Sequence, residues 1–123
     1  MFEYSKAPEA KLVSFASSYG HFINGKFTRP ANTYPTINPA TEEVLSQISH
    51  GSAKDVDLAV KAARAAYEKT WSKLSGAERG KYLYRIARTM QERARELAVA
   101  ETLNNGKPIK ETRDFDVPTA VSW

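Results

Sequence analysis

The 123-residue chain has the composition of an ordinary soluble globular protein, with 41% hydrophobic and 26% charged residues. No apolar stretch approaches the roughly 20 residues that a membrane-spanning helix needs, so we expect no membrane association. The sequence contains no cysteine, which excludes disulfides, thiolate metal sites and cysteine nucleophiles within it and is consistent with a cytoplasmic protein.

The net charge of +4 is unevenly spread. The segment from Lys54 to Arg113 carries 14 of the 18 basic residues but only 8 of the 14 acidic ones. A basic helical segment raises the question of nucleic-acid binding. Because acidic residues are interleaved with the basic ones and no recognisable binding motif accompanies them, solvated helix faces are the favoured interpretation. We therefore expect no nucleic-acid partner.

The first 20 residues are expected to form a flexible arm ahead of a folded part over residues 21–123. The stretch from Met1 to Tyr19 has acids and a proline where a secretory signal would carry a basic start and an apolar centre. Secretion is therefore not expected.

Two short β-hairpins are predicted after the arm. The first is centred on Asn24-Gly25, because both residues readily take the positive φ that a type I′ turn requires. The second joins β-prone residues 34–37 and 44–48 through the turn cluster Asn38-Pro39-Ala40-Thr41. An isolated hairpin is marginal in water, so both must pack against other elements.

Two long helices are predicted next. Ser52 to Asp55 and Ser75 to Glu78 both have the spacing of a capping box, in which a serine and an acid three residues later satisfy free backbone N–H groups. The second helix is the longer, and Asn104-Asn105-Gly106 is expected to end it. Trp71, just past the first helix, is expected to fold back onto its apolar stripe. Apolar residues recur at helical spacing along each helix: Val56, Ala59, Val60, Ala63 and Tyr67 in the first, and Leu83, Ile86, Ala87, Met90, Ala94, Leu97 and Ala98 in the second.

A third helix is predicted to begin at Pro118, a good first helical residue, with Asp114 and Asp116 ahead of it. Its apolar run from Thr119 to Trp123 spans less than two turns. Helix nucleation is costly, so a helix this short is unstable alone. This favours the interpretation that the sequence is a fragment of a longer protein.

The residues alone predict no catalytic or cofactor-binding site. His21 and His50 are the only histidines, and no further ligands at metal-binding spacing accompany them. The acidic pairs Glu42-Glu43 and Asp114-x-Asp116 do not indicate two carboxylates converging on one substrate. The six glycines form no Gly-x-Gly-x-x-Gly loop. Lys107 is interpreted as an exposed lysine after a helix stop rather than a phosphate ligand.

The ordered set of motifs does resemble a known family. The set includes Phe22-Ile23-Asn24-Gly25-Lys26, Thr36-Ile37-Asn38-Pro39-Ala40-Thr41-Glu42-Glu43-Val44, the segment from Gly51 to Tyr67, and Glu101-Thr102-Leu103-Asn104-Asn105-Gly106-Lys107-Pro108. From about residue 21 onward, this order and spacing closely resemble the start of the aldehyde dehydrogenase superfamily. Each motif is weak alone, and the ordered set carries the resemblance.

The resemblance implies that the chain is the amino-terminal segment of an NAD(P)-dependent enzyme that oxidises an aldehyde to a carboxylic acid. The expected fold is an α+β fragment: two small hairpins, two long helices and a truncated third, from the outer layer of a Rossmann-like coenzyme domain. The parent would use NAD or NADP, bind a small aldehyde and form a homo-oligomer. The family's nucleophile, base and coenzyme-phosphate residues would lie beyond Trp123, so the segment alone is expected to be inactive.

One site of the family maps onto this sequence. A monovalent or hard cation would take backbone oxygen from around Thr36 and Ile37 and the carboxylate of Asp114, since oxygen ligands suit such an ion. Capping of the third helix by Asp114 is an equally open interpretation. Two other hypotheses for the whole chain stay open: a short non-enzymatic interaction or oligomerisation protein built from the same helices, and nucleic-acid binding through the basic helices.

Overall fold

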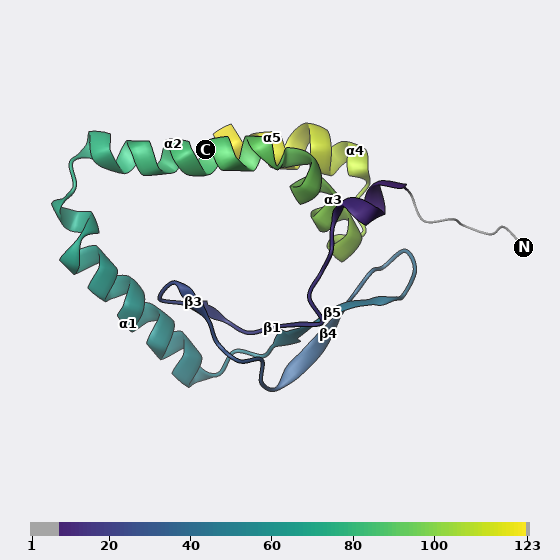
Figure 1. Cartoon of the computed structure of the whole chain (residues 1–123), viewed down its shortest axis with the longest axis horizontal. Helices are drawn as coiled ribbons and strands as arrows, with labels where there is room; N and C mark the ends of the chain where they lie inside the picture. Colours follow the sequence, from purple (N-terminus) through teal and green to yellow (C-terminus); the bar gives the residue numbers. More distant parts are fainter. Residues whose placement is uncertain (1–7, 123) are drawn as a thin grey trace, which may run out of the picture.

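The computed structural model describes residues 8–122 and shows two small sheets followed by a chain of helices (Figure 1). The strands are β1 (Ser18–Tyr19), β2 (Phe22–Ile23), β3 (Lys26–Phe27), β4 (Thr33–Ile37) and β5 (Val44–Ser49). The helices are α1 (Ala53–Lys69), α2 (Gly76–Glu92), α3 (Ala94–Asn105), α4 (Ile109–Glu111) and α5 (Val117–Ser122), with a π turn at Thr112–Asp116 and 3-10 turns at Pro8–Leu12 and Trp71–Lys73. No helix within this described part is long and apolar enough to cross a membrane.

The first predicted hairpin is confirmed. Strands β2 and β3 pair antiparallel, with Phe22 opposite Phe27. Between them Asn24 and Gly25 both have positive φ, 53° and 76°, as a type I′ turn requires. The two phenylalanine rings lie on the same side with centroids 4.9 Å apart, so they form the cross-strand contact that stabilises so short a pair.

The second predicted hairpin is also confirmed, in strands β4 and β5. The carbonyl of Asn38 accepts hydrogen bonds from the backbone N–H groups of Thr41 and Glu42, and the Asn38 side chain accepts one from Ala40 N at 3.0 Å. Glu42 takes a positive φ of 59° to close the turn. Asn38 is buried, and these bonds satisfy it.

A third strand, which the sequence did not predict, joins this hairpin. Strand β1 pairs in parallel with β5, so the sheet order is β1-β5-β4. Ser46 Oγ and Ser49 Oγ donate to backbone carbonyls beside β1, those of Ala16 at 2.8 Å and Tyr19 at 3.0 Å. Of the arm expected over residues 1–20, residues 1–7 lie outside the described part, while Ser18–Tyr19 belongs to this sheet.

Both capping boxes are confirmed. Asp55 N donates to Ser52 Oγ at 3.3 Å, and Ser52 N donates to Asp55 Oδ2 at 2.9 Å. Ser75 and Glu78 repeat the arrangement at 3.3 and 2.8 Å. Each box satisfies backbone donors that the first helical turn leaves free, so α1 and α2 begin where the sequence indicates.

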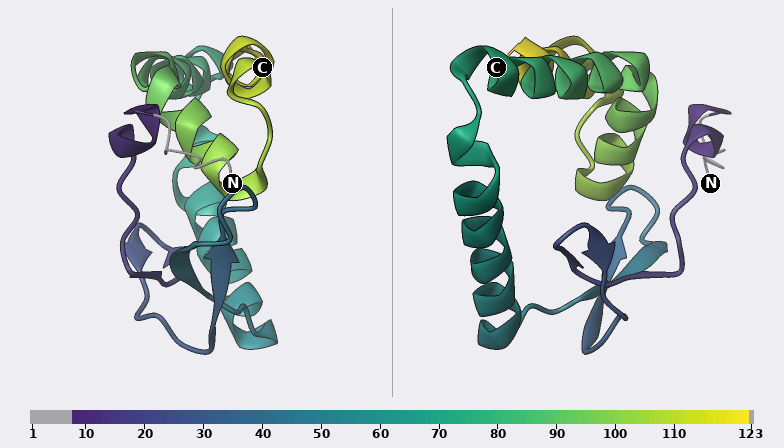
Figure 2. Two further views of the ribbon diagram at one scale, coloured as in Figure 1. Left: turned by 90° about the vertical axis from the view of Figure 1, so that its right-hand side faces the viewer. Right: turned by 60° about the vertical axis from the view of Figure 1, so that its left-hand side comes forward.

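The prediction of a single long helix from Ser75 to Asn104 is wrong, because the helix is interrupted at Arg93. This residue has φ −108° and ψ 17°, outside helical values, and α3 turns sharply away from α2 (Figure 2). The guanidinium of Arg93 is held by Glu96 at 2.5 Å. Apolar spacing continues across the break, so periodicity alone could not reveal it. The predicted stripe is therefore divided between two differently directed helices.

The third helix begins nine residues earlier than expected. Helical structure starts at Ile109 and passes through the π turn into α5, so Pro118 is an interior residue and not the first one. Proline has no N–H to donate to the carbonyl four residues before it. Just before it, Val117 N donates instead to the carbonyl of Thr112, five residues back. The wider π turn thus accommodates Pro118 without ending the helix.

The fully shielded core of the described residues is small. Its buried hydrophobic members are Ala98 and Val99 on α3 and Val117 on α5, and Thr112 is buried beside them. Thr112 Oγ1 is hydrogen-bonded to Thr102 at 2.9 Å, which ties the π turn to α3. Helices α1 and α2 contribute no buried residue. In Figure 2 they form two sides of an open frame, with α3 and the sheets as the others.

Candidate functional site

No metal-binding cluster is present among residues 8–122: no three of their histidine, aspartate and glutamate side chains gather closely enough to hold an ion. The sequence as a whole has no cysteine. A covalent nucleophile of the thiol type therefore cannot come from this sequence.

The three residues of the predicted cation site lie in two different parts of the fold. Thr36 and Ile37 form the end of β4, and the Thr36 hydroxyl donates to the side-chain oxygen of Asn104 at the end of α3. Asp114 lies in the π turn between α4 and α5. No hydrogen bond joins Asp114 to the two strand residues in the described part, and a shared ion stays a prediction.

The Asp114 carboxylate is held by its neighbour. Arg113 donates to it with two nitrogens at 2.5 and 2.7 Å. This hydrogen bonding lowers the pKa of Asp114, and the positive charges of Arg113 and Lys110 add to the effect. Asp114 is thus an ionised, half-exposed acid. The alternative that it caps the third helix is wrong, because that helix already begins at Ile109.

The neighbouring acid Asp116 makes the contact that sequence analysis missed. Lys107 Nζ lies 2.7 and 2.5 Å from its two carboxylate oxygens. The hydrogen bond to Asp116 is the main cause that raises the pKa of Lys107. Lys107 follows Gly106, which ends α3 with φ 77°, so the pair fastens the chain after α3 to the π turn. The helix stop at Gly106 is confirmed, and Lys107 is 38% exposed but paired with Asp116.

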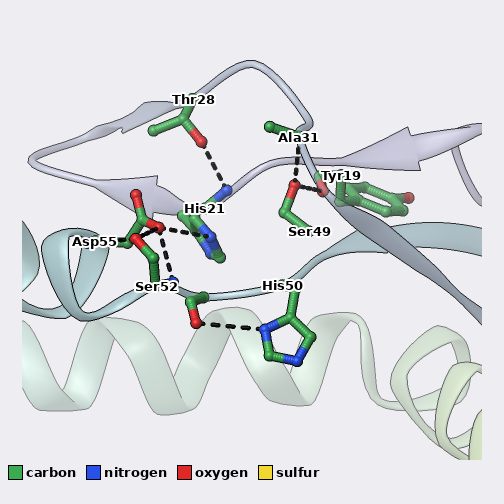
Figure 3. A network of polar contacts seen from close by, with 9 residues as sticks. Tyr19, His21, Thr28, Ala31, Ser49, His50, Ser52 and Asp55 are labelled. Carbon is green, nitrogen blue, oxygen red and sulfur yellow. Dashed lines mark hydrogen bonds and ion pairs between the residues drawn. The ribbon is translucent and has the colours of Figure 1, made fainter.

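The two histidines do not form a site together. His21 Nε2 lies 3.9 Å from Asp55 Oδ2, the carboxylate that already accepts from Ser52 (Figure 3). The bonds from Ser52 are the main cause that lowers the pKa of Asp55, and His21 adds a smaller effect. His50 instead turns its Nδ1 toward the carbonyl of Gly51 at 3.4 Å.

This network fixes the first hairpin to the start of α1. His21 N donates to Thr28 Oγ1 at 2.9 Å, and Thr28 N donates to the carbonyl of His21 at 2.8 Å. A Cβ at the adjacent Gly20 would lie 2.0 Å from the Thr28 carbonyl oxygen, so only glycine fits there. The contacts are those of a structural junction between sheet and helix.

A second junction joins the other hairpin to α3. The ring of Pro39 lies where a Cβ on Gly106 would be 3.2 Å away, and the Thr36 hydroxyl reaches Asn104 on the same helix end. The hairpin turn and the end of α3 are therefore in close contact, although more than 60 residues separate them in the sequence.

An apolar hollow lies in the corner between α2 and α3. It has a volume of about 390 Å³. Its floor and rim are formed by Tyr82, Ile86, Met90, Leu97, Arg85 and Arg93. The sequence contained a signal for it, since Ile86, Met90 and Leu97 belong to the predicted stripe, but the corner exists only because the helix breaks at Arg93.

Comparison with known proteins places these features in context. Residues 27–123 match the family model described as the aldehyde dehydrogenase family. A Bacillus subtilis protein named as an aldehyde dehydrogenase, DhaS, is 47% identical over 103 residues. The match covers 81% of this chain and 21% of DhaS. The mitochondrial aldehyde dehydrogenase family 2 member B4 of Arabidopsis thaliana is 36% identical over 95% of this chain and 23% of its own length.

Solved structures give the same result. The NAD⁺ complex of an aldehyde dehydrogenase from Bacillus cereus is similar with a TM-score of 0.83 and 37% identity, over 95% of this chain and 24% of that one. A Pseudomonas syringae aldehyde dehydrogenase C variant with NAD⁺ and octanal has a TM-score of 0.77 at 36% identity, over 97% and 23%. The chain thus spans about a fifth to a quarter of the length of these relatives.

Proposed function

The chain belongs to the aldehyde dehydrogenase family, and we propose that it is the amino-terminal scaffold segment of an NAD(P)-dependent enzyme that oxidises an aldehyde to a carboxylic acid. The observation that carries this proposal is the match over residues 27–123, together with a fold similar at TM-score 0.83 over 95% of the chain. Relatives solved with NAD⁺, one of them also with octanal, support the choice of coenzyme and substrate class.

The residues in hand do not fit a dinucleotide. No glycine-rich turn links a strand to a helix N-terminus in the described part: Gly20 and Gly25 serve the first hairpin, and Gly106 ends α3. Such a turn is what brings backbone N–H groups to a pyrophosphate. NAD or NADP would accept a hydride from the substrate in the parent enzyme.

This chain contributes structural support to the enzyme. The capping boxes fix where α1 and α2 begin. The contact of His21 with Asp55 joins the first hairpin to α1, and the bond from Thr36 to Asn104 joins the second to α3. The Lys107–Asp116 ion pair then sets the direction in which the chain leaves α3. A rigid outer scaffold of this kind can hold a site that other parts of an enzyme supply.

The proposal is tested by aldehyde-dependent NADH formation. The isolated chain is expected to form none, because it has no cysteine. The Bacillus cereus enzyme with its matched segment replaced by this chain is expected to form NADH from a medium-chain aldehyde. A folded replacement enzyme that binds NAD⁺ but does not oxidise aldehydes would contradict the proposed role.

A non-enzymatic interaction or oligomerisation protein is the second candidate. The observation that favours it is the exposed apolar surface on α1 and α2, including Val56, Val60, Leu83 and Ile86, each more than half exposed. Surfaces of this kind commonly mark interaction sites. It predicts a stable complex of the isolated chain with itself or another protein, and a replacement enzyme without activity. Homo-oligomerisation of the parent, its cytoplasmic location and the cation near Thr36 and Asp114 stay predictions.

A further inference from the structure

The sequence contains two asparagines that directly precede a glycine, Asn24 and Asn105. An asparagine in this position can lose its side-chain amide without an enzyme, because the backbone nitrogen of the next residue attacks the side-chain carbonyl carbon within the same chain. Glycine favours the attack, since it has no side chain to obstruct its nitrogen. Both asparagines are exposed, so exposure alone does not decide which of them reacts.

The first hairpin leaves the reacting atoms free. Among residues 8–122, no hydrogen bond is found for the Asn24 side chain or for the Gly25 N–H. A Cβ at Gly25 would meet nothing within 4 Å, so water reaches this turn. Strands β2 and β3 have two residues each, and the paired rings of Phe22 and Phe27 are 64% and 66% exposed. Local opening of so small a hairpin costs little free energy.

The end of α3 holds the corresponding atoms in place. Gly106 N donates to the carbonyl of Thr102 at 2.9 Å. The Asn105 side chain accepts from Lys107 N at 2.7 Å and donates to a carboxylate oxygen of Glu101 at 3.4 Å. The Gly106 nitrogen and the Asn105 side chain must give up these bonds before they can react with each other.

The packing around the end of α3 adds to this protection. The ring of Pro39 lies where a Cβ on Gly106 would be 3.2 Å away, and Lys107 Nζ is bound to Asp116 at 2.7 and 2.5 Å. Opening of this helix end disrupts a tertiary contact and an ion pair as well as the helix cap. The open state is therefore rarer at Asn105 than at the first hairpin.

We propose that Asn24–Gly25 is a site of spontaneous deamidation, and that the fold protects Asn105–Gly106 from the same reaction. The Gly25 nitrogen forms a bond to Cγ of Asn24 and gives its proton to water, and the side-chain nitrogen leaves as ammonia, which produces a cyclic imide. One water then opens the ring. Cleavage of the bond from the Gly25 nitrogen to Cγ yields aspartate, and cleavage of its bond to the backbone carbonyl carbon yields isoaspartate.

Isoaspartate at this position changes the turn. Its main chain passes through the side-chain carbons, so the backbone between the two strands becomes one methylene longer. The two-residue turn depends on positive φ at Asn24 and Gly25, 53° and 76°, and a lengthened backbone cannot keep the pairing of Phe22 with Phe27. Aspartate, in contrast, is accepted in a type I′ turn. Isoaspartate therefore opens the first hairpin, and aspartate leaves it closed.

The test compares the two asparagines within the 123-residue chain. The chain is incubated in mildly alkaline buffer, once folded and once in concentrated guanidinium chloride, and is then digested with pepsin at acid pH. Mass spectrometry follows the loss of the amide in each peptide, and an isoaspartyl methyltransferase identifies isoaspartate. Each site's rate in the folded chain is divided by its own rate in the denaturant, which removes the effect of neighbouring sequence.

This ratio is expected to be at least about tenfold larger for Asn24 than for Asn105, because reaction at Asn105 must wait for the rarer opening. Equal ratios, or a larger one at Asn105, would overturn the proposal. Asn24→Gln is the matched control, because glutamine would have to form a larger ring. Its folded chain should form almost no isoaspartate, and an unchanged amount would place the reaction elsewhere and contradict the proposed site.

Two further measurements test the reason for the difference. Pro39→Ala should raise the folded-chain rate at Asn105 at least about threefold and leave that at Asn24 unchanged; no rise at Asn105 would show that the contact with Gly106 protects nothing. The fraction that contains isoaspartate, separated by ion exchange, should be cleaved by trypsin after Lys26 faster than the variant Asn24→Asp. Equal cleavage would contradict the opening of the hairpin.

Discussion

The contribution of the contact between Gly106 and Pro39 to stability can be measured by comparison with a second glycine that has the same left-handed backbone conformation. Gly106 ends α3 with φ 77°, and Gly25 closes the first hairpin with φ 76°. A Cβ at Gly106 would lie 3.2 Å from two Pro39 carbons, whereas a Cβ at Gly25 would meet nothing within 4 Å. Alanine at either position therefore carries the same backbone strain, and only Gly106→Ala adds crowding.

The left-handed conformation costs an L-residue about 1–2 kcal/mol. Crowding in a packed contact adds about 1 kcal/mol or more. Gly106→Ala is therefore expected to lower the free energy of unfolding by about 2–3 kcal/mol, and Gly25→Ala by about 1–2 kcal/mol. Asparagine tolerates this conformation better than alanine, so Gly106→Asn and Gly25→Asn keep the difference in crowding while reducing the strain common to both.

The assay is urea unfolding of the 123-residue chain, followed by the circular dichroism of its helices and extrapolated linearly to water. Dilute protein is used, so that self-association does not contribute. Equal losses for Gly106→Ala and Gly25→Ala would refute the reasoning, because the hairpin turn would then not press against the end of α3. An unchanged slope with urea shows that the variants differ in stability and not in compactness.

Three further predictions concern the caps and the ion pair. Ser75→Ala should lower the free energy of unfolding by about 1 kcal/mol, since it removes the cap of α2; urea unfolding checks this, and no change would contradict the capping box. Because the Ser75 hydrogen bonds lower the pKa of Glu78 below its ordinary 4.5, its stabilisation is complete above the unfolded pKa and is lost as the pH falls through the folded one. Acid titration of the helix signal should therefore show the difference between wild type and Ser75→Ala narrowing as the pH falls below 4.5 without vanishing, because Ser75 Oγ still accepts from Glu78 N; a constant difference would argue against the linkage. Lys107→Met should destabilise the chain more than Met at the exposed Lys110, because it leaves the largely buried Asp116 without its cation; equal melting temperatures for the two variants would show that the ion pair contributes nothing.

Features set by neighbouring residues could be predicted from the sequence. The two capping boxes, the Asn24-Gly25 turn and the left-handed Gly106 all appear in the structure where local spacing placed them. Each depends on hydrogen bonds or φ values within a few residues, so the sequence contains nearly all the information that determines it.

Features set by tertiary contacts could not be predicted from the sequence. Strand β1 pairs with β5, and Ser49 of β5 donates to the carbonyl of Tyr19 across 30 residues. The break at Arg93 leaves the apolar spacing undisturbed, so a periodic pattern cannot report it. The pair between Lys107 and Asp116 depends on helix beginning at Ile109, nine residues before the proline that was expected to start it.

The same division applies to the candidate site. The stripe with Ile86 and Met90 indicated an apolar face. That the face becomes a hollow depends on the turn from α2 into α3. Asp114 was placed by resemblance alone, and the structure shows it bound to Arg113, while its share in a cation site stays a prediction.

The most direct test of the scaffold role is aldehyde-dependent NADH formation, measured side by side for the isolated chain and for the Bacillus cereus enzyme in which this chain replaces the matched segment. We predict none from the isolated chain and clear turnover from the replacement enzyme. Turnover by the isolated chain, or a folded and NAD⁺-binding replacement enzyme that leaves aldehyde untouched, would contradict the assignment of this chain as a structural part of an aldehyde-oxidising enzyme.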